Sequence, residues 1–136
     1  MLGPPDDFEG ELKAQSQELL LAGHLNLAMA YLKVDNFAEA VKNCDKALAI
    51  DANNEKGLFR RGQAYLGLKE YDLAKNDFQA VLKLDPNNKA AKNQLLQCVQ
   101  AIKAQLEKEK TTYRNMFELF AKQDLKVVVL TSTTLL

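Results

Sequence analysis

The sequence predicts an all-α protein built as a stack of helical hairpins, an α-α superhelix, which is closed by a long C-terminal helix. Three observations predict this fold class. Apolar residues recur at helical spacing through most of the chain, the chain matches itself without a gap when it is shifted by 34 residues, and one apolar stripe continues after residue 89. A repeat of this length is typical of stacked helical units, each of which buries its apolar face against its neighbour.

Composition and charge indicate one globular, intracellular domain. Of the 136 residues, 47% are hydrophobic and 26% are charged, which are ordinary values for a soluble protein. Lys and Arg total 18, as do Asp and Glu, so no net basicity favours nucleic acid or a membrane surface. Cys44 and Cys98 stand alone in apolar context, which is typical of reduced thiols in a cytoplasmic or nuclear protein. The longest apolar runs are too short to cross a bilayer.

The N-terminal part predicts a flexible lead over residues 1–8, followed by a lead-in helix over residues 9–20. Asp6 and Glu9 have the spacing of a capping box, which marks the start of a helix. The helical pattern then continues into the next segment and is interrupted only by Gly23, at a cost of about 1 kcal/mol. We therefore expect one long helix here, or two nearly continuous ones.

Residues 21–54 and 55–88 are the two copies of the repeat. Each copy holds two amphipathic helices joined by a short polar turn. An asparagine precedes several of the helices, and its side chain can accept a hydrogen bond from a backbone N–H of the first turn. The asparagines in these positions are Asn36, Asn54 and Asn88.

After the second copy the sequence predicts a single helix in place of another helical hairpin. Residues 89–121 predict one long capping helix, because Ala91, Leu95, Cys98, Ile102 and Leu106 follow helical spacing. Repeat stacks need a terminal element with a polar outer face, and the charged run after Leu106 suits that role. We place the end of the domain at residue 123. The final stretch, residues 124–136, is β-branched and without helical period, so we expect an extended or disordered tail.

The coinciding residues resemble the tetratricopeptide repeat, whose pattern runs small, aromatic, small, bulky, small and proline. In the second copy these positions hold Gly62, Tyr65, Ala74, Phe78, Val81 and Pro86. In the first copy they hold Ala28, Tyr31, Ala40, Cys44, Ala47 and Ala52. Small residues let paired helices approach closely, and the aromatic residues fill the space between pairs. Val81 and Ala52 depart from the pattern.

Lys56 and Arg60 form the leading candidate site. They lie one helical turn apart and therefore on the same helix face. Asn26 occupies the position of Arg60 in the preceding copy and interrupts an apolar run. Three polar donors on one wall suit a carboxylate ligand, although the two cations alone could equally be a solvated surface. Residues expected to line the adjoining groove are Met29, Phe59 and Gln63.

The stretches HLNLAMAYLK, NEKGLFRRGQAYL, DFQAVLKLDPNNKAAKNQL and YRNMF resemble the C-terminal half of the large FKBP-type immunophilins, over roughly residues 9–123. In that family the repeat domain binds the C-terminal Met-Glu-Glu-Val-Asp tail of the 90-kDa heat-shock protein through a clamp of Lys, Asn and Arg side chains. The resemblance implies that Asn26, Lys56 and Arg60 are three of the clamp residues. Two further clamp residues, the rest of the first repeat and the prolyl isomerase domains have no counterpart here. We therefore expect a non-catalytic co-chaperone module with a partial clamp, which binds the tail of the 90-kDa or the 70-kDa chaperone class.

Other chemistry-bearing residues have structural interpretations. His24 is the only histidine and lies at a packing position, so neither a metal site nor a cofactor is expected. Cys44 takes the place of a bulky core residue. Glu70, Asp72 and Asp77 are expected to face solvent by periodicity, which argues against a catalytic carboxylate pair.

Two further interactions enter as weaker alternatives. Residues 103–122 combine cations with the apolar anchors Leu106, Tyr113 and Phe117, a pattern that calmodulin targets share, but interspersed glutamates dilute the charge and favour plain capping. The first repeat helix is apolar on more than one side, around Leu20, Leu21, His24 and Leu27. A scaffold that has lost its peptide site and self-associates through such a surface is therefore the alternative function.

Overall fold

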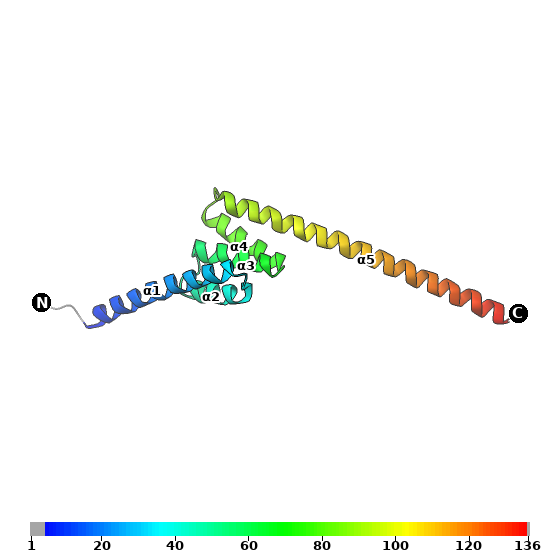
Figure 1. Cartoon of the computed structure of the whole chain (residues 1–136), viewed down its shortest axis with the longest axis horizontal. Helices are drawn as coiled ribbons and strands as arrows, with labels where there is room; N and C mark the ends of the chain where they lie inside the picture. Colours follow the sequence, from blue (N-terminus) through cyan, green and yellow to red (C-terminus); the bar gives the residue numbers. More distant parts are fainter. Residues whose placement is uncertain (1–4, 136) are drawn as a thin grey trace. The chain divides into compact units, whose positions relative to one another are not determined.

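The computed structural model describes residues 5–135, with side chains described for residues 8–124. Over these residues the chain forms five α-helices and no strand, which confirms the predicted all-α fold. The helices are α1 (Pro5–Lys33), α2 (Phe37–Ile50), α3 (Glu55–Gly67), α4 (Tyr71–Leu84) and α5 (Lys89–Leu135) (Figure 1). The chain divides into two units, one ending at Val99 and one beginning at Gln100.

Helical hairpins make up the first unit. α1 packs on α2, α3 packs on α4, and α2 packs in turn on α3 (Figure 1). The turns inside the two hairpins have the same backbone conformation, with Asp35 at a φ of 58° and Lys69 at a φ of 62°. These residues are 34 positions apart, and both occupy the left-handed region that few residues other than glycine adopt. The repeat seen in the sequence is therefore also a repeat of backbone geometry.

Three asparagines fix the starts of their helices, as predicted. In each case the side-chain oxygen accepts a backbone N–H, which satisfies one of the unpaired donors of a helix N-terminus. The three bonds join Asn36 to the N–H of Glu39 at 3.4 Å, Asn54 to that of Gly57 at 2.9 Å, and Asn88 to that of Ala91 at 3.0 Å. The cap at Asn54 sets the first turn of α3 and thereby the direction in which Lys56 points.

Close packing through small residues positions α3 against α4. The Phe78 ring is fully buried and lies against Gly62, where an added Cβ atom would stand 2.8 Å from ring carbons. Phe78 also packs in one core cluster with Cys98 of α5. Ala91 of α5 likewise packs on Val81 of α4. The first turns of α5 therefore cover the outer side of the second hairpin.

Both predicted ends of the helical domain are wrong. α1 begins at Pro5, so the expected flexible lead is already helical at residues 5–8, while residues 1–4 lie outside the described part. Proline suits this first helical position, where its missing N–H has no partner to lose. α5 continues to Leu135, so the expected extended tail is helical. No Gly or Pro interrupts the chain after Lys89, and β-branched residues lower helix propensity by only a fraction of a kcal/mol each.

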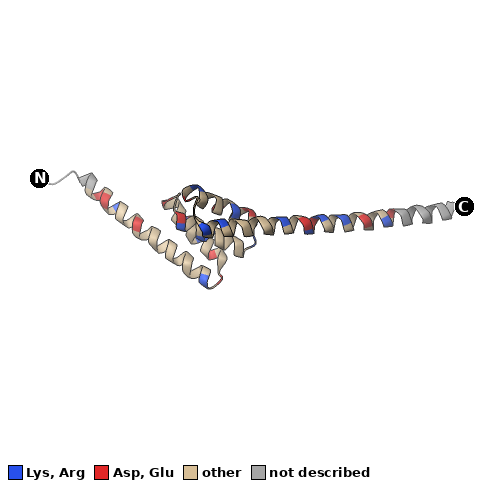
Figure 2. Cartoon of the chain, turned by 90° about the horizontal axis from the view of Figure 1, so that it is seen from above, with Lys and Arg blue, Asp and Glu red and all other residues tan. Residues whose placement is uncertain are grey.

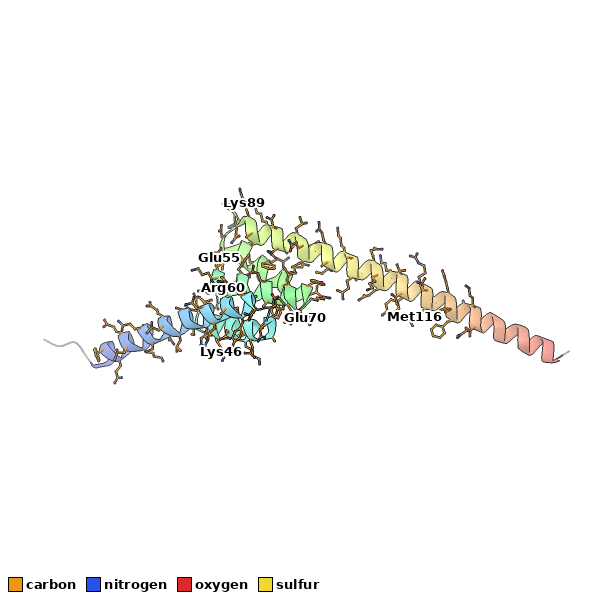
Figure 3. All side chains as sticks on the ribbon, viewed as in Figure 1. Lys46, Glu55, Arg60, Glu70, Lys89 and Met116 are labelled. Atoms are coloured by element: carbon orange, nitrogen blue, oxygen red, sulfur yellow. The ribbon has the colours of Figure 1, made fainter. Side chains whose placement is uncertain are left out.

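In the second unit, every side chain from Lys103 to Asp124 is exposed (Figure 3). Positive and negative side chains follow each other along this part of α5 (Figure 2). The apolar anchors Leu106, Tyr113 and Phe117 are 52%, 69% and 75% exposed. Both the charged and the apolar side chains of this part of α5 are therefore exposed.

α1 carries the apolar surface that the sequence predicts. Leu20 and Leu27 are exposed, and Leu21 and His24 are half-buried. Despite this apolar character, none of the described helices has a stretch that is both long and apolar enough to cross a membrane.

Candidate functional site

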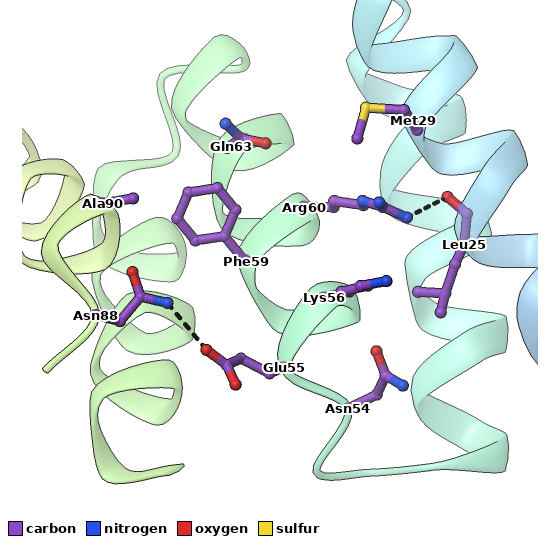
Figure 4. A pocket seen from close by; sticks show the side chains of 10 residues that line it. All are labelled: Leu25, Met29, Asn54, Glu55, Lys56, Phe59, Arg60, Gln63, Asn88 and Ala90. Atoms are coloured by element: carbon purple, nitrogen blue, oxygen red, sulfur yellow. Dashed lines mark hydrogen bonds between the residues drawn. The ribbon is translucent and has the colours of Figure 1, made fainter. Parts of the chain in front are cut away.

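An open pocket of about 820 Å³ lies on the first unit, where α1, α3 and the start of α5 face one another (Figure 4). Its lining combines apolar side chains with polar and charged ones. The residues that line it are Leu25, Met29, Asn54, Glu55, Lys56, Phe59, Arg60, Gln63, Asn88 and Ala90. Five of the six residues expected at the site from sequence are therefore brought together here.

Arg60 is fixed on the wall next to α1. Its Nη1 donates a hydrogen bond of 2.8 Å to the backbone carbonyl oxygen of Leu25 (Figure 4). A guanidinium has five N–H donors, so this bond orients the group and leaves donors for a ligand. Among the described residues, Arg60 forms no ion pair. The pocket thus holds an oriented cation whose charge is not neutralised by a neighbouring carboxylate.

Lys56 stands one turn before Arg60 and points toward the same side (Figure 4). It is exposed, and no described acidic side chain pairs with it. Two cations on one face repel each other weakly in the absence of a ligand. An anion between them would relieve this repulsion and receive charge-assisted hydrogen bonds from both.

Apolar side chains form the rest of the wall. Phe59 is half-buried, and its ring meets that of Phe78 edge to face, with centroids 5.5 Å apart and an interplanar angle of 68°. This contact fixes the Phe59 ring from behind. Met29 lines the pocket from α1 and Gln63 from α3, so the three expected groove residues all lie on this surface.

Asn26 is the one expected site residue that does not line the pocket. It is exposed on α1, next to Leu25, whose carbonyl oxygen holds Arg60. The 34-residue repeat places it at the position equivalent to Arg60, outside the set of residues that line the pocket.

Sequence reasoning missed the wall opposite the cations. Asn88, directly before α5, donates a 2.9 Å hydrogen bond from Nδ2 to Oε1 of Glu55 on α3 (Figure 4). Asn88 was recognised only as a helix cap, a role that it also fills. The 34-residue repeat is the signal that could have indicated the pair of Asn88 and Glu55. It makes Asn54 and Asn88 equivalent, and Glu55 directly follows Asn54. The pocket therefore has a carboxylate on one wall and two cations on the other.

A second polar cluster lies outside the pocket and corrects one prediction. Asp77 was expected to face solvent, but it is buried and receives two hydrogen bonds from Arg61, at 2.9 Å from Nε and 2.8 Å from Nη2. Arg61 also donates to Asp45 at 2.9 Å. The bonds to Asp77 raise the pKa of the Arg61 guanidinium. Periodicity predicted Asp77 on the polar side of α4. In the structure α3 packs against α4, and Arg61 of α3 bonds to the Asp77 carboxylate. Glu70 and Asp72 are exposed, as expected.

Cys44, Cys98 and His24 have the structural roles expected of them. Both thiols are fully buried, and burial raises the pKa of Cys44 to about 12 and also raises that of Cys98. His24 is half-buried, with Nδ1 3.4 Å from Oδ1 of Asn43. No group of three or more metal-binding side chains occurs among the described residues.

Comparisons with known proteins agree with this architecture. The family model of the tetratricopeptide repeat matches residues 22–54 and 55–88. The chain is 56% identical over 119 residues to peptidyl-prolyl cis-trans isomerase FKBP4 of Bos taurus, which covers 88% of the chain and 26% of the relative. The chain thus spans about a quarter of the length of this relative.

Solved structures extend the likeness to the fold. The first repeat domain of Spaghetti (RPAP3), bound to the HSP90 peptide SRMEEVD, matches with a TM-score of 0.60 and 36% identity, over 60% of this chain and 65% of that one. The second repeat domain of human RPAP3, in complex with the HSP70 peptide SGPTIEEVD, matches with a TM-score of 0.56 and 40% identity, over 57% of this chain and 65% of that one. The chain belongs to the tetratricopeptide-repeat family, and its predicted likeness to the repeat domain of the FKBP-type immunophilins is confirmed.

Proposed function

We propose that this chain is a non-catalytic, co-chaperone-type interaction module that binds the acidic C-terminal tail of the 90-kDa heat-shock protein, in the cytoplasm or nucleus. The observation that carries the proposal is the pair of cations on one wall of the pocket, Lys56 and Arg60, without an acidic partner among the described residues. Charge-assisted hydrogen bonds of this kind to a carboxylate contribute roughly 1.5–3 kcal/mol each.

The comparisons support a peptide tail as the ligand. Two similar repeat domains are described as bound to chaperone peptides, and both peptides end in Glu-Glu-Val-Asp. A C-terminal aspartate offers two carboxylates close together, which suits two cations one helical turn apart. The Phe59 ring and Met29 on the same pocket suit the apolar valine that precedes it. Asn26, which is exposed on α1 next to Leu25, is the third member of the proposed clamp.

The test is a calorimetric titration of the chain with the peptide Met-Glu-Glu-Val-Asp. We expect saturable binding to the peptide with a free C-terminus and clearly weaker binding to the same peptide with an amidated C-terminus. The amidated peptide is the control, because it keeps every side chain and loses only the terminal charge. Equal binding of the two peptides, or no binding of either, would contradict the proposal.

Self-association is a second candidate function, favoured by the exposed apolar surface of α1. Leu20 and Leu27 are 54% and 48% exposed, and contiguous surfaces of this kind invite association. In this case sedimentation at increasing concentration would show a dimer, and a Leu20→Glu, Leu27→Glu variant would remain monomeric. A strictly monomeric parent chain at high concentration excludes this candidate.

A further inference from the structure

The pocket has two walls of opposite charge, and α3 contributes to both. Lys56 and Arg60 lie four residues apart and form one row along the helix, which points toward α1 (Figure 4). Glu55 and Phe59 also lie four residues apart and form the adjacent row. The Glu55 carboxylate points toward Asn88 and away from the two cations (Figure 4). Adjacent rows of one helix therefore present opposite charges to the same ligand.

Asn88 holds the Glu55 carboxylate in place. Its Oδ1 accepts the N–H of Ala91, which fixes the orientation of the amide, and its Nδ2 donates to Glu55 Oε1 at 2.9 Å. A neutral amide orients the carboxylate without neutralising it. Among the described residues, Glu55 has no cationic partner. The carboxylate is therefore a fixed charge on the pocket wall.

We propose that Glu55 is a specificity-determining residue of this pocket, and that it disfavours an acidic ligand side chain on the wall near α5 and favours a cation or an amide there. The proposal rests on the proposed function, because it needs a peptide whose carboxylate is held by Lys56 and Arg60. Such a peptide runs past Phe59 toward Asn88 and brings one of its upstream side chains to Glu55. The pocket then selects among acidic tails by the residue at that upstream position.

The direction of the effect follows from charge. A ligand Lys at Glu55 gains an attraction, and a ligand Glu there meets a repulsion. In an open pocket each of these pair interactions has the size of an exposed ion pair, so their sum changes relative affinity by about threefold to tenfold. Removing the Glu55 charge should abolish this preference and leave the terminal carboxylate bound.

The experiment is a double-mutant cycle between Glu55 and the peptide. The peptides are Met-Glu-Glu-Val-Asp and two variants in which Lys replaces the first or the second Glu. Each is titrated against the parent chain and against Glu55→Gln, which keeps an oxygen for Asn88 and loses the charge. Glu70→Gln is the matched control, because Glu70 is an exposed acidic residue that precedes a helix outside the pocket and makes no side-chain cap bond.

At one of the two peptide positions, we expect the Lys-over-Glu preference of the parent to exceed that of Glu55→Gln by about threefold to tenfold. Glu70→Gln should behave as the parent does. Equal preferences in the parent and in Glu55→Gln at both positions would overturn this inference while leaving the clamp intact. Binding that does not depend on the free C-terminus would overturn the proposed function, and this inference with it. Circular dichroism of each variant confirms that the fold is unchanged.

Discussion

Arg61 and Asp77 form a two-pronged ion pair between α3 and α4, with Nε 2.9 Å from Oδ2 and Nη2 2.8 Å from Oδ1. The Asp77 side chain is 6% exposed and that of Arg61 is 25% exposed. The same guanidinium reaches Asp45 on α2 at 2.9 Å and lies 6.0 Å from the centroid of the Tyr65 ring. The Arg61 side chain therefore links α3 to both α2 and α4. Arg61 directly follows Arg60, which lines the pocket.

We predict that Asp77→Ala lowers the free energy of unfolding by about 1–3 kcal/mol, because it leaves a half-buried guanidinium with only Asp45 as a partner. Asp45→Ala should cost less than about 1 kcal/mol, since the Asp45 side chain is 53% exposed. Urea denaturation followed by circular dichroism measures both values. Equal losses in the two variants would show that burial of Asp77 does not matter to stability.

Gly62→Ala should destabilise the fold by about 1–3 kcal/mol, because the added Cβ atom would stand 2.8 Å from the fully buried Phe78 ring. Gly23→Ala is the matched control. Nothing lies within 4 Å of a Cβ at this position, so alanine should stabilise α1 by about 0.5–1 kcal/mol. Thermal melts of the two variants should therefore shift in opposite directions. A Gly62→Ala protein as stable as the parent would contradict the packing described for this helix pair.

Arg60→Ala should weaken binding of the free-carboxylate tail peptide by about 1.5–3 kcal/mol. Lys56→Ala should cost less, because an ammonium cannot donate two parallel hydrogen bonds to one carboxylate. Asn26→Ala should cost about 0.5–1.5 kcal/mol as the loss of a neutral donor. Affinity should also fall as salt rises, since the pocket is open. Calorimetric titration measures all four effects, and undiminished binding by Arg60→Ala would refute the proposed clamp.

The buried thiol of Cys44 should make the protein less stable in alkaline solution. Burial raises its pKa from 9.0 to about 12. Below about pH 9 both the folded and the unfolded states keep the proton, whereas between about pH 9 and pH 12 the unfolded state loses it first. The free energy of unfolding should therefore decrease as pH rises through this interval, by at most about 1.36 kcal/mol per pH unit from this group.

Denaturation curves at pH 8, 9 and 10 test this dependence. Cys44→Ala should show a shallower decrease than the parent. A decrease of the same sign should persist in this variant, because burial also raises the pKa values of Tyr65 and Cys98. If Cys44→Ala and the parent show the same pH dependence, the buried thiol does not account for the alkaline loss of stability.

The sequence by itself determined the local structure and its repetition. Helical periodicity placed Lys56 and Arg60 on one face of α3, and the asparagine caps marked where three helices begin, because both depend on residues within a few positions of each other. The 34-residue repeat predicted the stacked hairpins, since equivalent residues must make equivalent contacts. Local composition was misleading at the chain ends, where β-branched residues continue α5 and Pro5 begins α1.

Only the tertiary structure decided which side chains meet across helices. It placed Arg60 on the Leu25 carbonyl, buried Asp77 against Arg61, and brought Asn88 to Glu55. Each of these pairs joins residues at least 16 positions apart, and each depends on the separation and rotation of two packed helices. The sequence pattern gives the face of a helix on which a residue lies. Side-chain packing, such as the contact of Gly62 with Phe78, fixes how closely the neighbouring helix approaches that face and therefore which polar groups bond.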